Sequence, residues 1–336
     1  MRPIQFVAKT AGVSVATVSR VLNNSPLVKE STRKKVMETI RALEYEPNSL
    51  GRELRRAETR RIMVLTPSLV FPIMADVYKG IQDVAQKNGY QVLVCASEDD
   101  HDKEEELLQM LKKKIVDGVI IVASTLSAEE LDQLAKDYSI VQCSEYEQVQ
   151  HAYSVSVDNE QAAYDAVSHL LSLGHRRIAM VKGGNAKSSS AAREQGYRRA
   201  LESAGIEVRQ EWIRESDYEY QNGYDLAVEW LQAAEHPTAI FCSSDATAIG
   251  CVNGAISLGK SVPDDVAVVG FDDTVESLMS RPPITTVRQP KYDLGRAAME
   301  ALLQSLRGEA GENKTILLPH EIVIRESTAK RSRYID

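Results

Sequence analysis

Apolar positions recur every three or four residues in three stretches between residues 4 and 45, the spacing that places side chains on one face of a helix. Gly12 follows the first stretch and predicts a helix end or a tight turn, because glycine adopts left-handed backbone angles without strain. Ser14 precedes the second stretch as a candidate N-cap, and Ser31 or Thr32 precedes the third. A helix, a glycine-containing turn and a second helix within about 20 residues are typical of a helix-turn-helix unit.

From residue 61 onward, short apolar runs alternate with amphipathic helical stretches. Strands are predicted at residues 61–66, 90–97, 117–124, 139–144, 152–158, 176–183, 238–244, 266–273 and 284–288. Apolar strands separated by helices indicate parallel sheets covered by helices on both faces. So many strands fit two similar α/β lobes better than one sheet, with the division near Asp158 and Asn159.

The chain has 336 residues, enough for two or three domains with cores of their own. Its four cysteines are widely spaced and form no CxxC pair, which argues against a disulfide framework and a structural zinc site. The chain begins MRPIQFVAKTAG, without the features of a signal peptide, and it has no long apolar run. We therefore expect a soluble cytoplasmic protein that needs no membrane, metal or cofactor.

Charge is distributed unevenly between the predicted helical head and the rest of the chain. Residues 1–61 contain 13 Lys and Arg against 6 Asp and Glu, a net charge of +7, whereas the remaining residues sum to −15. A cationic head on an anionic body favours a nucleic-acid-binding module joined to another domain. A solvated basic surface without a partner remains an equal alternative on charge alone.

The helical head carries a specific order of sequence blocks: AGVSVATVSRVLNN, then VKESTRKKV, then YEPNSLGRELRR. This order resembles the N-terminal signature of the lactose/galactose repressor (LacI/GalR) family, and the resemblance continues along nearly the whole chain. It implies an all-α helix-turn-helix head and a two-lobed α/β body similar to a periplasmic sugar-binding protein. It also implies a homodimeric transcriptional regulator, most simply a repressor, whose partners are double-stranded palindromic operator DNA and a small-molecule effector.

The resemblance also implies the domain boundaries. Residues 1–46 form the DNA-binding head, residues 47–59 the hinge, and residues 60–336 the effector-binding and dimerisation body. Within the body, one lobe is expected at about 60–157 and 289–316, and the other at about 158–288 and 317–327.

By resemblance, residues 15–22 are the recognition helix that enters the major groove. Val15, Ala16 and Arg20 would face base edges, because arginine grips guanine bidentately and small apolar groups touch the thymine methyl. The alternative for Val15 and Ala16 is that they are only exposed helix formers. Polar residues suited to phosphate contacts are Ser14, Thr17, Ser19 and Asn23.

The segment 47–57 is too short and too rich in helix-breaking residues to form a stable helix alone in water. In the family this segment becomes helical on operator DNA, and Leu54 occupies the position of the leucine that wedges into the minor groove. Arg55 follows where a basic residue reaches the groove. A plain charged linker is the alternative for residues 56–61.

Ligands of parallel α/β sheets bind at the carboxyl ends of the strands. Polar residues at those ends are Ser68, Asp158, Lys187, Ser189, Asp245, Asp272 and Asp273. Hydroxyl and charged groups suit a polyhydroxylated ligand, because each ligand hydroxyl both donates and accepts. For Asp158 and Asp245, capping of the following helix is an equal alternative.

The resemblance adds residues to this pocket. With Asp272, the implied effector-binding residues are Ile73, Arg193, Tyr218, Ser244 and Gln289. Arg193 and Asp272 would anchor the effector, and the ring of Tyr218 would stack on a sugar or a base. Ile73 lies in an entrance loop where many family members carry two aromatic rings, so stacking from this loop is in doubt.

Body blocks such as DKEEELLQMLKKKIVDGVIIV and VDNEQAAYDAVSHL look most like the cytidine (nucleoside-responsive) repressor branch. The expected effector is therefore a nucleoside or a sugar. Both induction and corepression occur in the family, so the sign of the response stays open.

Two other classes of function are weaker. A solute-binding transport protein would explain the body but neither the basic head nor the absent signal peptide. A sugar or nucleotide enzyme lacks its motifs, because Ala186 replaces the second glycine of a phosphate loop and no GxGxxG follows the first strand.

Overall fold

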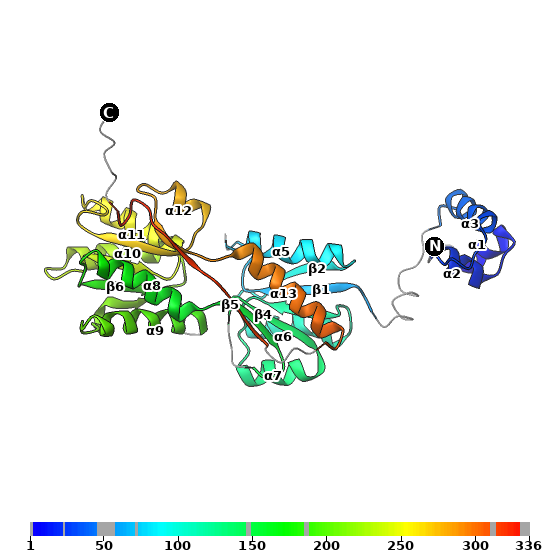
Figure 1. The fold of residues 1–336 in the computed structure, drawn as a ribbon, viewed down its shortest axis with the longest axis horizontal. Coiled ribbons are helices and arrows are strands. Elements are labelled where there is room, and N and C mark those ends of the chain that lie inside the picture. The colour runs from blue at the N-terminus through cyan, green and yellow to red at the C-terminus, as the bar shows by residue number, and fades with distance from the viewer. Residues whose placement is uncertain are drawn as a thin grey trace, which may run out of the picture. The chain divides into compact units, whose positions relative to one another are not determined.

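A computed structural model describes residues 3–22, 24–45, 58–70, 73–145, 149–184, 188–309 and 314–329. The chain divides into two compact units, a head within Met1–Thr59 and a body within Arg60–Asp336 (Figure 1). Along the described part of the chain, no helix has the length and apolarity that a membrane-spanning segment needs.

The head is a bundle of three short helices, α1 (Ile4–Ala11), α2 (Val15–Leu22) and α3 (Glu30–Ala42). Gly12 ends α1 in the left-handed conformation, with φ of 64°, and its N–H donates to carbonyls of the last turn, as predicted. The helices enclose a small core of Val7, Ala8, Ala11, Val18, Val21, Val36 and Tyr45.

The start of α3 differs from the prediction. The helix begins at Glu30, so neither Ser31 nor Thr32 is its N-cap. Lys29 takes the cap position with an extended backbone and no side-chain cap, and its carbonyl accepts from Arg33 N at 3.0 Å.

The first lobe of the body contains a six-stranded parallel sheet in the order β11-β5-β4-β3-β1-β2. Its strands are β1 (Arg61–Thr66), β2 (Gln91–Ala96), β3 (Gly118–Ile121), β4 (Ser139–Cys143), β5 (Tyr153–Val157) and β11 (Thr315–Leu318). Its helices are α5 (Met74–Lys87), α6 (His101–Lys112), α7 (Ala128–Asp137) and α13 (Lys291–Leu306).

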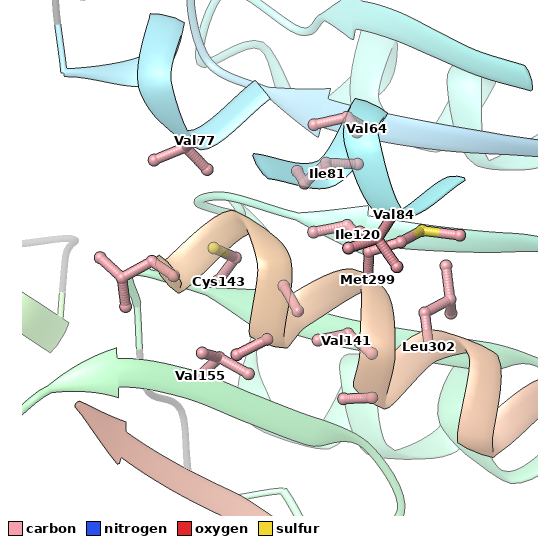
Figure 2. Close-up of a cluster of buried hydrophobic side chains, with 14 of the residues drawn as sticks. Val64, Val77, Ile81, Val84, Ile120, Val141, Cys143, Val155, Met299 and Leu302 are labelled. Atoms are coloured by element: carbon pink, nitrogen blue, oxygen red, sulfur yellow. The ribbon is translucent and has the colours of Figure 1, made fainter. Parts of the chain in front are cut away.

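Alternate residues of β1 pack on opposite faces of this sheet, because successive strand side chains point to opposite sides. Ile62 and Val64 belong to the cluster under α5 and α13, which Figure 2 shows between these helices and the sheet. Met63 and Leu65 belong to the cluster under α6 and α7. Burial on both faces explains why the strand reads as a continuous apolar run.

The second lobe repeats this plan with a sheet in the order β12-β10-β9-β8-β6-β7. Its strands are β6 (Ile178–Lys182), β7 (Ile213–Glu215), β8 (Ala239–Cys242), β9 (Ala267–Asp272), β10 (Thr285–Arg288) and β12 (Glu321–Val323). Its helices are α8 (Asn159–Ser172), α9 (Ser188–Ser203), α10 (Tyr220–Gln232), α11 (Asp245–Ser257) and the short α12 (Val275–Met279). All strand pairs are parallel except β10 with β12.

The chain passes between the two lobes three times, after β5, after β10 and after β11 (Figure 1). The third crossing follows β11, whose Leu317 and Leu318 pair with Ser156 and Val157 of β5 and so extend the first sheet to residue 318. All nine predicted strands form. Three strands were not predicted: β7, β11 and β12. Each has only three or four residues and lies at the edge of a sheet, where a strand pairs with one neighbour only and its apolar pattern is weaker.

Helices α5 and α13 approach so closely that their backbones touch. A Cβ atom on Gly80 would lie 2.1 Å from the carbonyl oxygen of Tyr292, and one on Gly295 would lie 2.0 Å from the carbonyl oxygen of Val77. Only glycine fits at these two positions. The two helices therefore form one unit over their face of the first sheet.

Candidate DNA-binding and ligand-binding sites

Helix α2 presents a distinct outer face, because its inner face is fixed by the core. Ser14 caps the helix: Thr17 N donates to Ser14 Oγ at 3.1 Å. Val18 and Val21 are buried against the other helices. The remaining side of the helix is exposed and carries Val15, Ala16 and Arg20.

Polar groups surround this exposed face. Ser14 is exposed and its Oγ lies 2.9 Å from Thr17 Oγ1, while Thr17 and Ser19 are partly buried. Asn23, Leu54 and Arg55 lie outside the described residues.

A cavity of about 700 Å³ lies between the two lobes of the body. The first lobe contributes Ile73, Met74, Val122 and Glu145 among others, and the second lobe contributes a larger polar part. Of the predicted effector-binding residues, those that line the cavity are Ile73, Ser189, Arg193, Tyr218, Ser244, Asp272 and Gln289.

One predicted effector-binding residue that the structure describes, Ser68, is not part of this lining. Ser68 is turned to local contacts, because its Oγ accepts from Val70 N at 3.2 Å and its carbonyl accepts from Thr66 Oγ1 at 3.0 Å. Pro67 beside it reaches the cavity instead. Lys187 lies outside the described residues.

Arg193 is a buried cation on α9, held by neutral partners. Its Nε donates to Asn159 Oδ1 at 2.9 Å and its Nη1 donates to the carbonyl of Ser243 at 2.7 Å. These contacts fix the plane of the guanidinium at the cavity wall.

Asp272 ends β9 at the cavity, where Gln289 Nε2 donates to its Oδ1 at 2.7 Å. Removal from solvent raises the pKa of this carboxyl to about 7, although the nearby Arg193 charge acts in the opposite direction. The backbone of Asp272 and Asp273 has φ of 115° and 54°, a conformation that costs energy for residues other than glycine. Lys291 Nζ stabilises this turn by donating to both carbonyls, at 3.1 and 2.6 Å.

Ser244 and Asp158 both cap helices. Ser244 Oγ accepts from Thr247 N at 3.3 Å at the start of α11, and Ser244 also lines the cavity. Asp158 Oδ1 accepts from Gln161 N at 2.9 Å at the start of α8, which agrees with the capping alternative.

Asp245 is fully buried and holds β10 and the loop before α12. Its Oδ1 accepts from Thr286 Oγ1 at 2.6 Å and its Oδ2 accepts from Thr274 N at 2.7 Å. Burial raises the pKa of its carboxyl to about 6. Asp245 therefore stabilises the interior of the second lobe, a role that neither ligand binding nor helix capping had predicted for it.

The ring of Tyr218 reaches the cavity past a glycine. A Cβ on Gly183 would lie 2.0 Å from Tyr218 Oη, so a larger residue at 183 would displace the ring. Burial also raises the pKa of the Tyr218 hydroxyl, which keeps it protonated as a hydrogen-bond donor.

Several lining residues were missed from the sequence: Asp99, Glu145, Asp217, Tyr220, Ile249 and Glu276. Glu145 directly follows the predicted strand 139–144, so the rule of strand carboxyl ends would have found it. Tyr220 and Ile249 lie on helices, where nothing in the local pattern distinguishes them from other partly exposed positions. The described residues bring together no group of three metal-ligating side chains.

Two family models match the chain. Residues 4–48 match bacterial regulatory proteins of the lacI family, and residues 167–328 match a periplasmic binding protein-like domain. Catabolite control protein A of Priestia megaterium is 40% identical over 97% of this chain and 98% of its own length. The chain belongs to the LacI family. Its relatives in this family are transcriptional regulators rather than enzymes, and the predicted family and repressor class are confirmed.

The LacI-family fold is also confirmed by a solved structure. The lac repressor dimer bound to operator and the anti-inducer ONPF matches with a TM-score of 0.88 and 29% identity over 96% of this chain and 98% of that one. The repressor CytR of Escherichia coli is 34% identical over 96% of this chain and 95% of its length. Because relatives with different names match over nearly the whole chain, overall identity does not single out the cytidine branch.

Proposed function

We propose that this LacI-family repressor binds operator DNA through the exposed face of α2. The observation that carries the proposal is the orientation of this helix, capped by Ser14 and turned so that Val15, Ala16 and Arg20 face outward. Arg20 reads a guanine edge and the two small residues contact thymine methyl groups. Ser14, Thr17, Ser19 and Asn23 contact phosphates and set the register of the helix.

The domain organisation follows from this role. Residues 1–46 form the DNA-binding head, residues 47–59 form a hinge with Leu54 and Arg55 in the minor groove, and the body binds the effector. The protein acts in the cytoplasm as a homodimer on a palindromic operator, because two identical heads related by a two-fold axis match two inverted half-sites. The similarity to a dimeric repressor solved on its operator supports this arrangement.

The interlobe cavity holds the effector, which is a nucleoside or a sugar. Arg193 and Asp272 anchor it by hydrogen bonds, Ser189, Ser244 and Gln289 contact its hydroxyls, and Tyr218 stacks on its ring; Ile73 closes the first-lobe side. Lys187 and Ser68 were expected here on sequence grounds, and Ser68 acts by shaping the loop after β1. Ligand binding changes the relative position of the lobes, and operator affinity follows.

The operator proposal is tested by selecting binding sites from random duplexes with the full chain. We expect an inverted repeat to be enriched and bound far more tightly than shuffled DNA at the same salt concentration. Binding that falls with salt equally for all sequences would contradict sequence recognition.

The effector proposal is tested by thermal shift of the full chain with nucleosides, free bases, pentoses, hexoses and disaccharides. A ligand at 100 times its Kd should add about 2.7 kcal/mol to the free energy of unfolding. The ligand that shifts the melt should also change operator affinity. A ligand that stabilises the protein without changing operator affinity would contradict the coupling.

A further inference from the structure

Glu145 joins the two lobes at the wall of the cavity. It follows β4 in the first lobe, and its carboxylate reaches the first turn of α9 in the second lobe. Its Oε2 accepts from Ser188 Oγ at 2.9 Å and from Ser189 N at 2.8 Å, and its Oε1 accepts from Ser189 Oγ at 2.6 Å. Both oxygens of the carboxylate are therefore engaged by one helix terminus.

The start of α9 is one place at the cavity that favours a negatively charged group. The first N–H groups of a helix have no partner within the helix, and the positive end of the helix dipole favours negative charge. Here one such N–H and two serine hydroxyls already point at a carboxylate. The protein's own side chain thus occupies an anion position at the cavity.

Most of the other charged residues of the lining are also acidic. Besides Glu145, the acidic residues of the lining are Asp99, Asp217, Asp272 and Glu276. Arg193 is the one basic residue among the lining residues that the structure describes, and two of its donor nitrogens are already used by Asn159 and Ser243. A phosphate or carboxylate group that entered the cavity would meet several carboxylates and little unpaired positive charge.

We propose that Glu145 is a specificity-determining residue that makes the cavity select uncharged or cationic hydroxylated ligands and reject anionic ones, such as sugar phosphates and nucleotides. This inference rests on the proposed function of the cavity as the effector site. Exclusion acts through charge and not through size, because about 700 Å³ is large enough for a nucleotide or a disaccharide. An anionic ligand would have to displace the Glu145 carboxylate and then lie beside it. The resulting charge repulsion weakens the binding of an anionic ligand but not that of an uncharged one.

The first test uses matched ligand pairs on the full chain: cytidine with cytidine monophosphate, and glucose with glucose 6-phosphate. For the native protein, thermal shift should never be larger for the phosphorylated member of a pair. A stabilisation by the phosphorylated member alone would overturn the proposal.

The second test uses inorganic phosphate and does not depend on the effector. Glu145→Ala leaves the N-terminus of α9 unfilled, and we expect it to bind phosphate at least tenfold more tightly than the native chain. Glu145→Gln removes the charge at nearly constant size and should show a gain in the same direction. Glu276→Gln is the matched control, since it removes a lining carboxylate that has no described hydrogen bond to α9, and its gain in phosphate affinity should be far smaller than that of the Glu145 variants.

The outcomes separate this inference from the proposed function. If both Glu145 variants fold and neither gains affinity for phosphate, Glu145 does not exclude anions and the inference fails. If no uncharged ligand stabilises the native chain, the effector function fails, while a phosphate gain in the Glu145 variants still shows that this residue fills an anion position.

Discussion

The guanidinium of Arg193 lies over the ring of Phe271, with Cζ 3.7 Å from the ring centroid. The ring supports one face of the guanidinium, and hydrogen bonds to Asn159 and Ser243 fix its edges. The side chain is thus oriented before a ligand arrives, so binding does not have to immobilise it.

Arg193→Ala should abolish the response of operator binding to the effector and leave ligand-free operator binding in place. The substitution also leaves Asn159 Oδ1 without its donor, so we expect a loss of about 1–3 kcal/mol of stability. Isothermal titration calorimetry would measure the ligand Kd, and urea unfolding would measure the loss of stability. Arg198→Ala is the control, because Arg198 lies on the same helix and pairs with Glu194. An unchanged ligand Kd in Arg193→Ala would refute the anchoring role.

Arg20→Ala should weaken binding to the selected operator by about 1–3 kcal/mol, roughly 5- to 150-fold, and relax the preference for one base pair in each half-site. Binding to unrelated DNA should fall much less, since phosphate contacts supply most of it. Fluorescence anisotropy with both duplexes would separate the effects. Arg41→Ala, an exposed arginine of α3, serves as the control for loss of charge. Equal losses on both duplexes would contradict base recognition by Arg20.

Asp272 should make stability depend on pH in a specific window. Because removal from solvent raises the pKa of its folded carboxyl to about 7, the folded chain retains a proton between pH 4 and 7 that the unfolded chain has released. The free energy of unfolding should therefore fall as pH rises through this window. The amide in Asp272→Asn has no proton to release in this range. A plot of its free energy of unfolding against pH should therefore be less steep, by up to about 1.4 kcal/mol per pH unit.

Urea unfolding at intervals from pH 4 to pH 8 would measure this difference. Asp245, whose folded pKa is also raised, to about 6, contributes with the same sign in both proteins and largely cancels in the comparison. Parallel curves for native protein and Asp272→Asn would show that Asp272 is ionised throughout.

Gly295→Ala should destabilise the body by about 2 kcal/mol or more, because the added Cβ would lie 2.0 Å from the carbonyl oxygen of Val77 and the helices would have to separate. Urea unfolding followed by circular dichroism would measure the loss. Gln304→Ala, at an exposed position of the same helix, should change stability little. A loss no larger than that of Gln304→Ala would contradict the close contact of α5 and α13.

Local pattern predicts most of the fold because burial on both faces of the sheets makes their strands visible as apolar runs. The edge strand β11 was not predicted, because its side chains are only partly buried and it pairs with one neighbouring strand only. Seven of the predicted effector residues line the cavity, because strand carboxyl ends and family motifs both point there.

What the sequence could not supply is contact between the lobes. Glu145 and Ser189 are 44 positions apart, and nothing in either segment indicates that one side chain reaches the other. Likewise Ser68 stands at a strand end, yet the turn after β1 directs its hydroxyl to Val70 N. The hydrogen-bond partners of these two side chains depend on the three-dimensional path of the loops that carry them, and the spacing of residues along the sequence does not determine that path.

The glycine contact between α5 and α13 limits how the body can deform. Because the two helices meet backbone to backbone and both cover the first sheet, sliding between them would produce immediate atomic overlap. The contact therefore opposes movement of α5 and α13 relative to each other within the first lobe. Widening of the cavity would then draw on rotations about backbone bonds in the three connections from β5 to α8, from β10 to α13 and from β11 to β12, and in the second of these Pro290 already fixes one φ angle.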